Sequence, residues 1–284
     1  MADCSHNCDS CSVSGCGDRT SSSAPEKLAT NAKTNIKHVV AVVSGKGGVG
    51  KSLVTSLLAA RMNKEGFKVG ILDADITGPS IAQTFGAKGI LSYDSVGIVP
   101  VSTQSGIKVM STNLVLPRDD TPVAWRGPVI TGVIRQFWNE TSWGDLDYLF
   151  IDMPPGTSDV FLTVFQLLPV DAIVTVSSPQ DLVAMIVGKA VNLAHSMNVP
   201  VVGLVENMAY FKCPDCNHEH YVFGEPQGKK VAEHYGIPAT AMLPMDPVFA
   251  KLCDEGRVEE YELGDSFDDV IAAINKAFEE GKQA

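Results

Sequence analysis

The sequence predicts an α/β fold in which a mostly parallel sheet is flanked by helices. Short apolar runs, rich in β-branched residues, alternate along the chain with segments of helical spacing. The apolar runs are nearly continuous, which is typical of strands covered on both faces. The first run also ends in a glycine-rich loop that leads directly into a helical segment. Because ligands of such folds bind at the carboxyl ends of the strands, functional residues are expected where each apolar run stops.

The expected elements follow one another with short connections. The predicted strands are residues 38–44, 69–75, 106–112, 147–152, 171–177 and 200–207. The predicted helices between them include residues 51–65, 129–140 and 181–197. A repeating strand–helix order of this kind implies right-handed crossovers between parallel strands.

The chain of 284 residues divides by composition into two parts. Residues 1–36 are rich in Ser, Asp, Asn, Thr and Cys and contain almost no large apolar residues, so this segment cannot bury enough surface to fold alone. We expect a flexible, cysteine-containing tail that is ordered only where a metal holds it. Residues 37–284 are expected to form one domain, since hydrophobic residues make up 45% of the chain and a sizeable core can be buried.

The charge balance excludes two classes of partner. Lys and Arg number 22 against 33 Asp and Glu, a formal net charge of -11, and no basic block is present. Non-specific electrostatic binding to nucleic acid or to an anionic membrane is therefore not expected. No apolar run approaches the roughly 20 residues that cross a bilayer, and the N-terminus lacks the apolar core of a signal peptide. We expect a cytoplasmic protein.

The glycine-rich loop has the pattern of a phosphate-binding loop. The residues that satisfy G-x-x-x-x-G-K-[ST] are Gly45, Lys46, Gly47, Gly48, Val49, Gly50, Lys51 and Ser52. The glycines let successive N–H groups point into one hollow, and the following helix adds the positive end of its dipole. Lys51 is expected to reach the β- and γ-phosphates of ATP, and the Ser52 hydroxyl suits Mg²⁺. The sequence thus predicts a P-loop NTPase domain.

Carboxylates stand at the ends of two further strands. Asp73 and Asp75 follow the second apolar run, where they could orient a water molecule or hold the hydration shell of Mg²⁺. An alternative for Asp73 is a strand-end residue that caps local backbone N–H groups. Asp152 ends the run 147–152, as a Mg²⁺ ligand of the Walker-B type requires. The Pro-Pro-Gly that comes next, with Thr157 after it, is interpreted as a stiff loop that senses the γ-phosphate.

The run GKGGVGKS closely resembles the deviant phosphate loop of the ATPases that include the septum-site, plasmid-partition and nitrogenase-iron-protein types. In these relatives the early lysine crosses a dimer interface to the partner's phosphates. The resemblance therefore implies a nucleotide-sandwich homodimer with Lys46 in that role. It also implies that Asp75, the second acid of D-x-D, positions the attacking water.

A narrower resemblance covers nearly the whole chain from about His38. The segments DADITGPS, TPVAWRGP, DMPPGTSD and VENMAYFKCPDC together resemble the Mrp/NBP/ApbC family of ATP-dependent iron–sulfur cluster carriers and scaffolds. The resemblance implies that Cys213 and Cys216 of two subunits bind a bridging [4Fe-4S] cluster at the dimer interface. It also implies that Asn207 lies against the adenine base; otherwise Asn207 is a strand-end residue that serves a turn.

The residues themselves indicate a metal site at Cys213 and Cys216 but do not identify the metal. One chain offers two thiolates where iron–sulfur clusters usually need four, so dimerisation would supply the other pair. A competing interpretation adds His218 and His220 to form a zinc knuckle within one chain, although the H-x-H spacing is shorter than usual. A thioredoxin-like redox pair fits less well, because that motif is expected at a helix start.

A second group of cysteines lies in the tail: Cys4, Cys8, Cys11 and Cys16. The minimal bacterial pattern of the family has no such tail, and the spacing differs from that of the eukaryotic type. These four thiolates could wrap a second [4Fe-4S] cluster or a Zn²⁺ ion. His6 inside the group is a further possible ligand or a solvated side chain. Cys253 is expected to be a buried small apolar residue.

The functional hypothesis is a homodimeric ATPase that holds a labile iron–sulfur cluster and transfers it to apo iron–sulfur acceptor proteins, with ATP binding and hydrolysis changing how tightly the cluster is held. Two alternatives are open. One is a ParA/MinD-like positioning switch. The acidic character of the C-terminal amphipathic segment argues against it, since docking to a membrane would need a basic segment. The other is a nitrogenase-reductase-like electron donor in which the cluster is redox-active.

Overall fold

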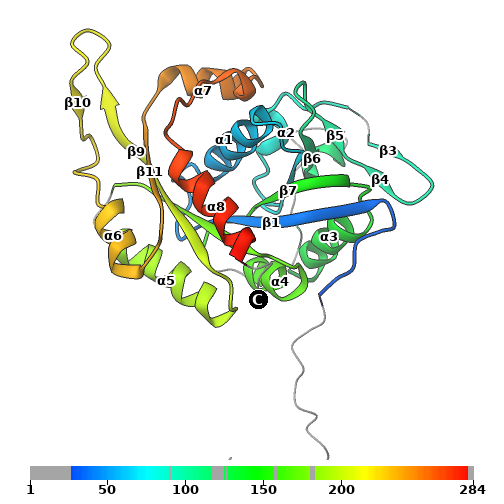
Figure 1. Cartoon of the computed structure of the whole chain (residues 1–284). Helices are drawn as coiled ribbons and strands as arrows, with labels where there is room; N and C mark the ends of the chain where they lie inside the picture. The colour runs from blue at the N-terminus through cyan, green and yellow to red at the C-terminus, as the bar shows by residue number, and fades with distance from the viewer. Residues whose placement is uncertain are drawn as a thin grey trace, which may run out of the picture.

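The computed structural model describes residues 27–89, 91–116, 125, 127–156, 159–179 and 183–280. Within these residues the chain forms one layer of sheet between two layers of helices (Figure 1). The predicted fold class, a mostly parallel sheet flanked by helices, is confirmed. The cysteine group at residues 4–16 lies outside the described residues.

The sheet contains nine strands among the described residues and is parallel through its centre. Its order is β10-β9-β8-β1-β7-β2-β6-β5, with β11 also paired to β9. Its antiparallel pairings are those of β5 with β6 and of β10 with β9; β3 and β4 form a separate hairpin. The strands are β1 (Thr34–Ser44), β2 (Val69–Asp73), β3 (Ser92–Tyr93), β4 (Ile98–Val99), β5 (Val101–Ser102), β6 (Lys108–Met110), β7 (Gly144–Asp152), β8 (Ala172–Ser177), β9 (Val201–Lys212), β10 (Glu219–His220) and β11 (Thr240–Pro244).

Helices cover both faces of this sheet. Figure 1 shows α1 and α8 on one face and α3, α4, α5 and α6 on the other. The helices are α1 (Lys51–Lys64), α2 (Ile81–Thr84), α3 (Gly127–Asn139), α4 (Asp159–Leu167), α5 (Val183–Ser196), α6 (Gly228–Tyr235), α7 (Pro247–Asp254) and α8 (Asp268–Glu280), with 3-10 turns η2 (Thr112–Leu114) and η3 (Val258–Glu260). No helix of the described part of the chain is both long and apolar enough to span a membrane.

The central strand β1 shows why the apolar runs become strands. Residues 39–44 are all buried, because β7 and β8 flank the strand and helices cover it above and below. A run of buried apolar residues could also belong to a buried helix. The β-branched side chains of this run favour the strand instead. The main core cluster of the described residues runs from β1 to α8, and a second, smaller cluster lies between β9, α5 and α6.

Several strand boundaries differ from the sequence prediction; β7 begins at Gly144 rather than at residue 147, and β9 ends at Lys212 rather than at residue 207. β1 begins at Thr34 rather than at residue 38, because the polar residues ahead of the apolar run pair with the start of β7. β2 ends at Asp73 rather than at residue 75, since the backbone then turns away from the sheet. Part of the predicted tail also packs on the domain: Lys27 donates to the carbonyl of Phe165, and Leu28 pairs with the end of α4.

The strand order brings the predicted site residues to one edge. β7 lies between β1 and β2, and Asp152 at its end is in register with both Val42 and Asp73. The loop 45–50 therefore starts beside the ends of β2 and β7, as parallel pairing requires. The carboxyl edge of the sheet is therefore the candidate location of the nucleotide site.

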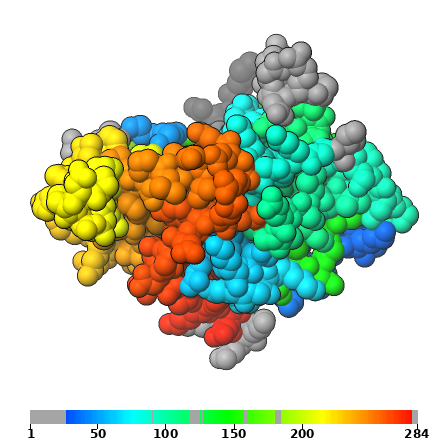
Figure 2. Space-filling model, turned by 90° about the horizontal axis from the view of Figure 1, so that it is seen from above, coloured from blue at the N-terminus to red at the C-terminus, as the bar shows by residue number. Residues whose placement is uncertain are grey.

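The longest strand, β9, continues past the sheet into a hairpin with β10. The hairpin projects from the body of the molecule (Figure 1), and Cys213 and Cys216 lie in the turn between its strands. Seen from above, the hairpin stands at one end of the molecule, and the segment of α7 lies between it and the segments of α1 and α2 (Figure 2). The thiols thus sit on a protruding element at the same edge as the loop.

Candidate functional site

The loop between β1 and α1 forms a phosphate-sized hollow. Gly48 and Gly50 have φ angles of 80° and 82°, a left-handed conformation that suits glycine, and α1 begins at Lys51. The helix N-terminus points its N–H groups and the positive end of its dipole at the hollow. A cavity of about 330 Å³ results, and its lining residues are Ser44, Gly47, Gly48, Gly50, Lys51, Ser52, Leu53, Asp75, Ser80, Thr84, Pro155 and Cys253.

Lys51 lies between two of the predicted carboxylates. Its Nζ is 2.8 Å from Oδ1 of Asp152 and 3.9 Å from Oδ2 of Asp75. Lys51 is 6% exposed and Asp152 is fully buried, so the pair interacts through a medium of low dielectric. A buried ammonium group that already has anionic partners is suited to exchange them for phosphate oxygens.

Asp152 is a buried acceptor shared by three side chains. Besides Lys51, the hydroxyl of Ser52 donates to it at 2.5 Å and that of Thr55 at 2.8 Å. The hydroxyl of Ser52 and the carboxylate of Asp152 are hard oxygen ligands in contact, which is a donor set that fits Mg²⁺. Sequence reasoning missed Thr55; its position one helical turn after Lys51 was the available signal.

Asp73 caps backbone rather than facing the cavity. Its carboxylate accepts hydrogen bonds from the N–H groups of Asp75 at 3.2 Å and Ile81 at 3.4 Å, and from the hydroxyl of Ser111 at 3.0 Å. Burial, with the nearby charge of Asp152, raises the pKa of Asp73 to about 7. The capping alternative is therefore the one that the structure favours, and Ser111 is a partner that no sequence motif indicated.

Asp75 lies in the cavity, on the loop that Asp73 holds. Its side chain is 15% exposed, and burial raises its pKa from the ordinary value in spite of Lys51 nearby. A carboxylate that faces the cavity, and whose basicity is increased by burial, is suited to orient a water molecule or to accept its proton.

The segment after β7 closes onto the phosphate loop. Gly156 has a φ of 81° and donates its N–H to the carbonyl of Ser44 at 2.8 Å, and Pro155 lines the cavity. This contact ties the predicted sensing loop to the last residue of β1, directly before the phosphate loop. Thr157 lies outside the described residues.

Not every residue of the loop motif lines the cavity. Gly45 instead faces α5, where an added Cβ would be 2.2 Å from Cγ2 of Ile186. Lys46 is exposed and is not among the residues that line the cavity. Val49 is buried, and its carbonyl accepts a hydrogen bond from Nδ2 of Asn207 at 2.9 Å.

A second, mostly apolar cavity of about 480 Å³ adjoins the first. Gly50, Leu53 and Cys253 line both. The remaining lining residues are Asn207, Met208, Phe211, Pro244, Met245, Asp246, Pro247, Phe249, Ala250 and Asp254. An apolar slot beside a phosphate loop has the character of a nucleobase site. Cys253, expected to be buried, is half-buried: it packs against the core but also lines both cavities, and burial raises its pKa to about 11.

Alanine at Gly50 is expected to destabilise the protein more than alanine at Gly48. Both positions have left-handed φ angles, so both substitutions are expected to cost about 1–2 kcal/mol of backbone strain. At Gly50 the new Cβ would be 2.2 Å from Nδ2 of Asn207, whereas at Gly48 nothing lies within 4 Å. Displacing Asn207 from the carbonyl of Val49 should cost about 1–3 kcal/mol more.

Urea unfolding of the two variants measures this difference, and the Gly48 variant is the matched control. Asn207→Ala is then added to each variant. It should remove the additional loss of unfolding free energy caused by alanine at Gly50, and should not change the loss caused by alanine at Gly48. Equal free energies of unfolding for the two glycine variants would contradict the tight contact between the loop and β9.

The hairpin turn holds the two predicted thiols. The backbone of Cys213 is fixed on both sides, since its N–H donates to the carbonyl of His218 and its carbonyl accepts from the N–H of Asn217, both at 2.9 Å. The N–H groups of Cys216 and Asp215 hydrogen-bond the sulfur and lower the pKa of Cys213. Such donors stabilise a thiolate, the form that binds iron. Cys216 is exposed.

One chain does not complete a metal site there. Across the part of the chain that the structure describes, no three His, Cys, Asp or Glu side chains are grouped closely enough to hold an ion. The rings of His218 and His220 lie edge to face, 4.9 Å apart, and do not join the thiols. The zinc knuckle within one chain is therefore not assembled among the described residues. The tail cysteines lie outside the described residues.

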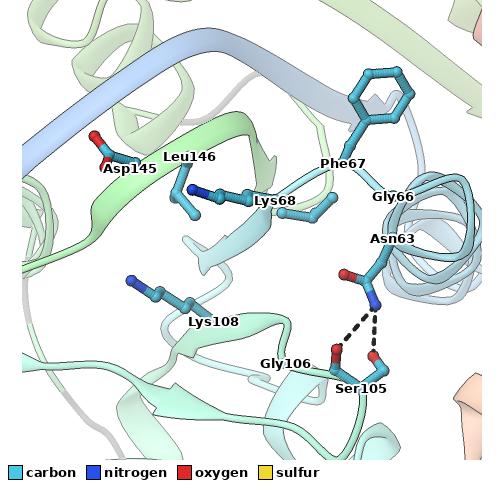
Figure 3. Close-up of a pocket in the computed structure, with 10 residues that line it drawn as sticks. Asn63, Gly66, Phe67, Lys68, Ser105, Gly106, Lys108, Asp145 and Leu146 are labelled. Atoms are coloured by element: carbon cyan, nitrogen blue, oxygen red, sulfur yellow. Dashed lines mark hydrogen bonds between the residues drawn. The ribbon is translucent and has the colours of Figure 1, made fainter.

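A further cavity of about 530 Å³ lies at the opposite, amino edge of the sheet. Figure 3 shows Lys68 and Lys108 beside it, with Asn63 bonded to Ser105. Several backbone N–H groups along its rim are engaged; those of Phe67 and Gly106 donate to backbone carbonyls, and that of Lys68 donates to the carboxylate of Asp147. This cavity lies at the edge opposite to the phosphate loop and shares no lining residue with the two cavities there.

Comparisons with known proteins agree with this geometry. The family model of the NUBPL iron-transfer P-loop NTPases (ParA) matches residues 35–277. The iron–sulfur cluster carrier protein of Clostridium perfringens is 50% identical over 263 residues, which is 90% of this chain and 92% of the relative.

Two solved structures are also similar. A nucleotide-binding protein from Archaeoglobus fulgidus, in complex with ADP, is 48% identical with a TM-score of 0.75, over 82% of this chain and 91% of that one. The cell-division ATPase MinD of Pyrococcus furiosus, 19% identical with a TM-score of 0.60 over 84% of this chain and 99% of that one, shares the fold.

Proposed function

Since the chain belongs to the family of NUBPL iron-transfer P-loop NTPases, we propose that it is an ATPase that carries an iron–sulfur cluster on Cys213 and Cys216 and transfers it to apo-proteins. The family implies nucleotide hydrolysis by the P-loop domain. The coupling of that hydrolysis to cluster transfer, and the roles of the individual residues, are the substance of the proposal.

The observation that carries the proposal is the position of the thiols. Cys213, whose sulfur is hydrogen-bonded by two N–H groups, follows directly on β9, the strand that also lines the cavity beside the phosphate loop. The candidate metal-binding thiols and the candidate nucleotide site are therefore connected by one structural element, β9.

The nucleotide site assigns a task to each residue. On binding ATP, Lys51 would leave Asp152 and Asp75 for the phosphate oxygens, and Asn207 would border the base. Ser52 and Asp152 would hold Mg²⁺, which neutralises phosphate charge when bound. Asp75 would orient the water that attacks the γ-phosphorus, so that ADP leaves and inorganic phosphate forms.

A homodimer completes both sites. Each chain supplies two thiolates, and two chains supply the four that a [4Fe-4S] cargo needs. Lys46, which is exposed, would reach the nucleotide of the partner subunit. The arrangement as a domain of residues 37–284 with a separate cysteine tail is part of the same proposal, as is a second metal on Cys4, Cys8, Cys11 and Cys16.

Anaerobic purification and a transfer assay test the function. Iron and acid-labile sulfide are counted per chain for the full protein and for a variant with all four tail cysteines changed to serine. Cluster transfer to an apo-ferredoxin is then followed with ATP, with ADP and without nucleotide. We expect cluster on the serine variant and a transfer rate that depends on nucleotide. Rates that are equal in all three conditions would overturn the coupling, and absence of iron would overturn the carrier function.

A further inference from the structure

Beyond its sixth residue β9 leaves the regular sheet. Its pairing with β8 ends at Glu206, which is opposite Ser177. Its pairing with β11 is interrupted after Glu206, opposite Met242, and resumes only at Tyr210, opposite Pro244. Residues 207–209 therefore form a bulge. The segment that follows forms an arm together with β10; it no longer pairs with β8, and its pairing with β11 is limited to Tyr210.

The centre of this bulge is strained. Met208 has a φ of 57°, a left-handed conformation that is unfavourable for a residue with a side chain. Such conformations persist only where the surroundings impose them, and they gather at switch regions. The neighbour on one side is Asn207, which is buried and bonded to the phosphate loop at Val49. The strained residue thus lies between the loop and the arm.

The apolar cavity is in contact with both sides of the bulge. Asn207 and Met208 line it from the bulge, and Phe211 lines it from the arm. Phe211 is opposite His220 in the hairpin and precedes Cys213 by two residues. A group that fills the cavity therefore touches the arm close to the thiols, without any contribution from a second chain.

We propose that Met208 is the hinge of this arm, and that a nucleobase in the cavity acts through it to reposition Cys213 and Cys216 within a single protomer. The inference rests on the proposed function for the identity of the cavity's occupant. A ligand shifts such an equilibrium only if it binds one arm position better than another, and contacts on both sides of a hinge provide that difference. Met208 is a positioning residue, since it acts through the arm.

A hinge that responds to the nucleobase differs from a sensor of the phosphates in which ligands move it. The base and its cavity are common to ATP and ADP, so both nucleotides should move the arm. Inorganic pyrophosphate, which can occupy the phosphate loop but has no base, should leave the arm where it is.

The test measures how fast iodoacetamide alkylates Cys213 and Cys216 in the full-length apo-protein, read peptide by peptide by mass spectrometry. Saturating ADP is expected to change these rates by about fivefold or more in the wild type, and pyrophosphate by less than about twofold. In Met208→Gly, which removes the strain and lets the hinge take many angles, the ADP effect should fall below about twofold. The conservative variant Met208→Leu should keep it.

Asn198→Gly is the matched control. Asn198 also has a left-handed φ, 55°, but lies in the turn ahead of β9, away from both cavities. The ADP effect should be unchanged in this variant. If Met208→Gly does not fold, Met208→Val replaces it, because a β-branched side chain disfavours positive φ and should also abolish the effect.

The outcomes separate the hinge from the carrier function. An ADP effect that persists in the glycine variant, or one that pyrophosphate reproduces, would overturn the hinge and leave the carrier proposal intact. No ADP effect in the wild type would also overturn the hinge, because apo-protein is used. The carrier function is judged separately by the iron content and transfer rates described above.

Discussion

Serine at Cys213 or Cys216 is expected to reduce the iron bound per chain by at least about tenfold, because even loss of a group that merely supports a metal ligand costs that much. Serine does not ionise at neutral pH, and its hard oxygen replaces poorly the soft thiolate that iron–sulfur clusters select. In a site shared by two chains, each substitution removes two of four ligands. Iron and sulfide analysis after anaerobic reconstitution measures the loss, in the background that lacks the four tail cysteines.

Cys253→Ser is the matched control for this prediction. Cys253 is also a free thiol of the described domain, but burial raises its pKa to about 11, so it stays protonated at neutral pH. Its replacement should leave the iron content unchanged. Retention of iron by both the Cys213 and the Cys216 variants would mean that the cargo is held elsewhere, and the assignment of the hairpin as the cluster site would be wrong.

Asparagine at Asp75 is expected to lower the turnover of ATP by about 10²- to 10⁴-fold, the range typical of a lost general base or water-orienting group. The amide cannot accept a proton from water. Besides the contact with Lys51, the carboxylate of Asp75 accepts hydrogen bonds from the N–H of Gly78 and the hydroxyl of Thr77. Both donors are on exposed residues and an amide oxygen can accept the same bonds, so the fold should be little affected. Steady-state hydrolysis and ADP binding are measured together, and the affinity for ADP should stay within about threefold if the interaction is made only in the transition state.

Asp73→Asn is the comparison that separates catalysis from positioning. Asp73 caps the same loop and accepts from Ser111 and from two backbone N–H groups, so this variant should also lose about 1–3 kcal/mol of unfolding free energy. Asp75→Asn should not. If the two variants lose equal turnover and equal stability, Asp75 has no separate chemical role.

The pH dependence gives a second test of Asp75. The group acts as a carboxylate, and burial places its pKa above the ordinary 3.8. Wild-type turnover should therefore fall on acidification at a higher pH than an exposed aspartate would give, since protonation removes the acceptor. The residual turnover of Asp75→Asn should lack this acidic limb.

Much of the nucleotide site was predictable because its signals are local. A glycine-rich turn between a strand and a helix specifies its own backbone, and the lysine at the helix start needs no distant partner to be recognised. The ends of the apolar runs also predicted that Asp75 and Asp152 lie close to this loop, because parallel strands end at one edge. The contacts of Lys51 with both carboxylates agree with that prediction.

Other partners depend on side chains that no spacing rule connects. Ser111 meets Asp73 because β6 pairs with β2, and Asn207 meets Val49 because β9 lies two strands away from β1. The choice between capping and metal binding for Asp73, and between two and four ligands at the hairpin, likewise required the positions of the neighbours. Sequence spacing does not contain these distances.

The sequence by itself determined the fold class, the phosphate loop and the cysteine pair, since each is written in residues close together in the chain and governed by backbone preferences. The tertiary structure alone decided that the strand directly before the pair lines the apolar cavity and that this strand contains Met208 in a strained conformation. The physical reason is that a left-handed residue within a strand is imposed by the packing of distant segments, against the local preference of methionine.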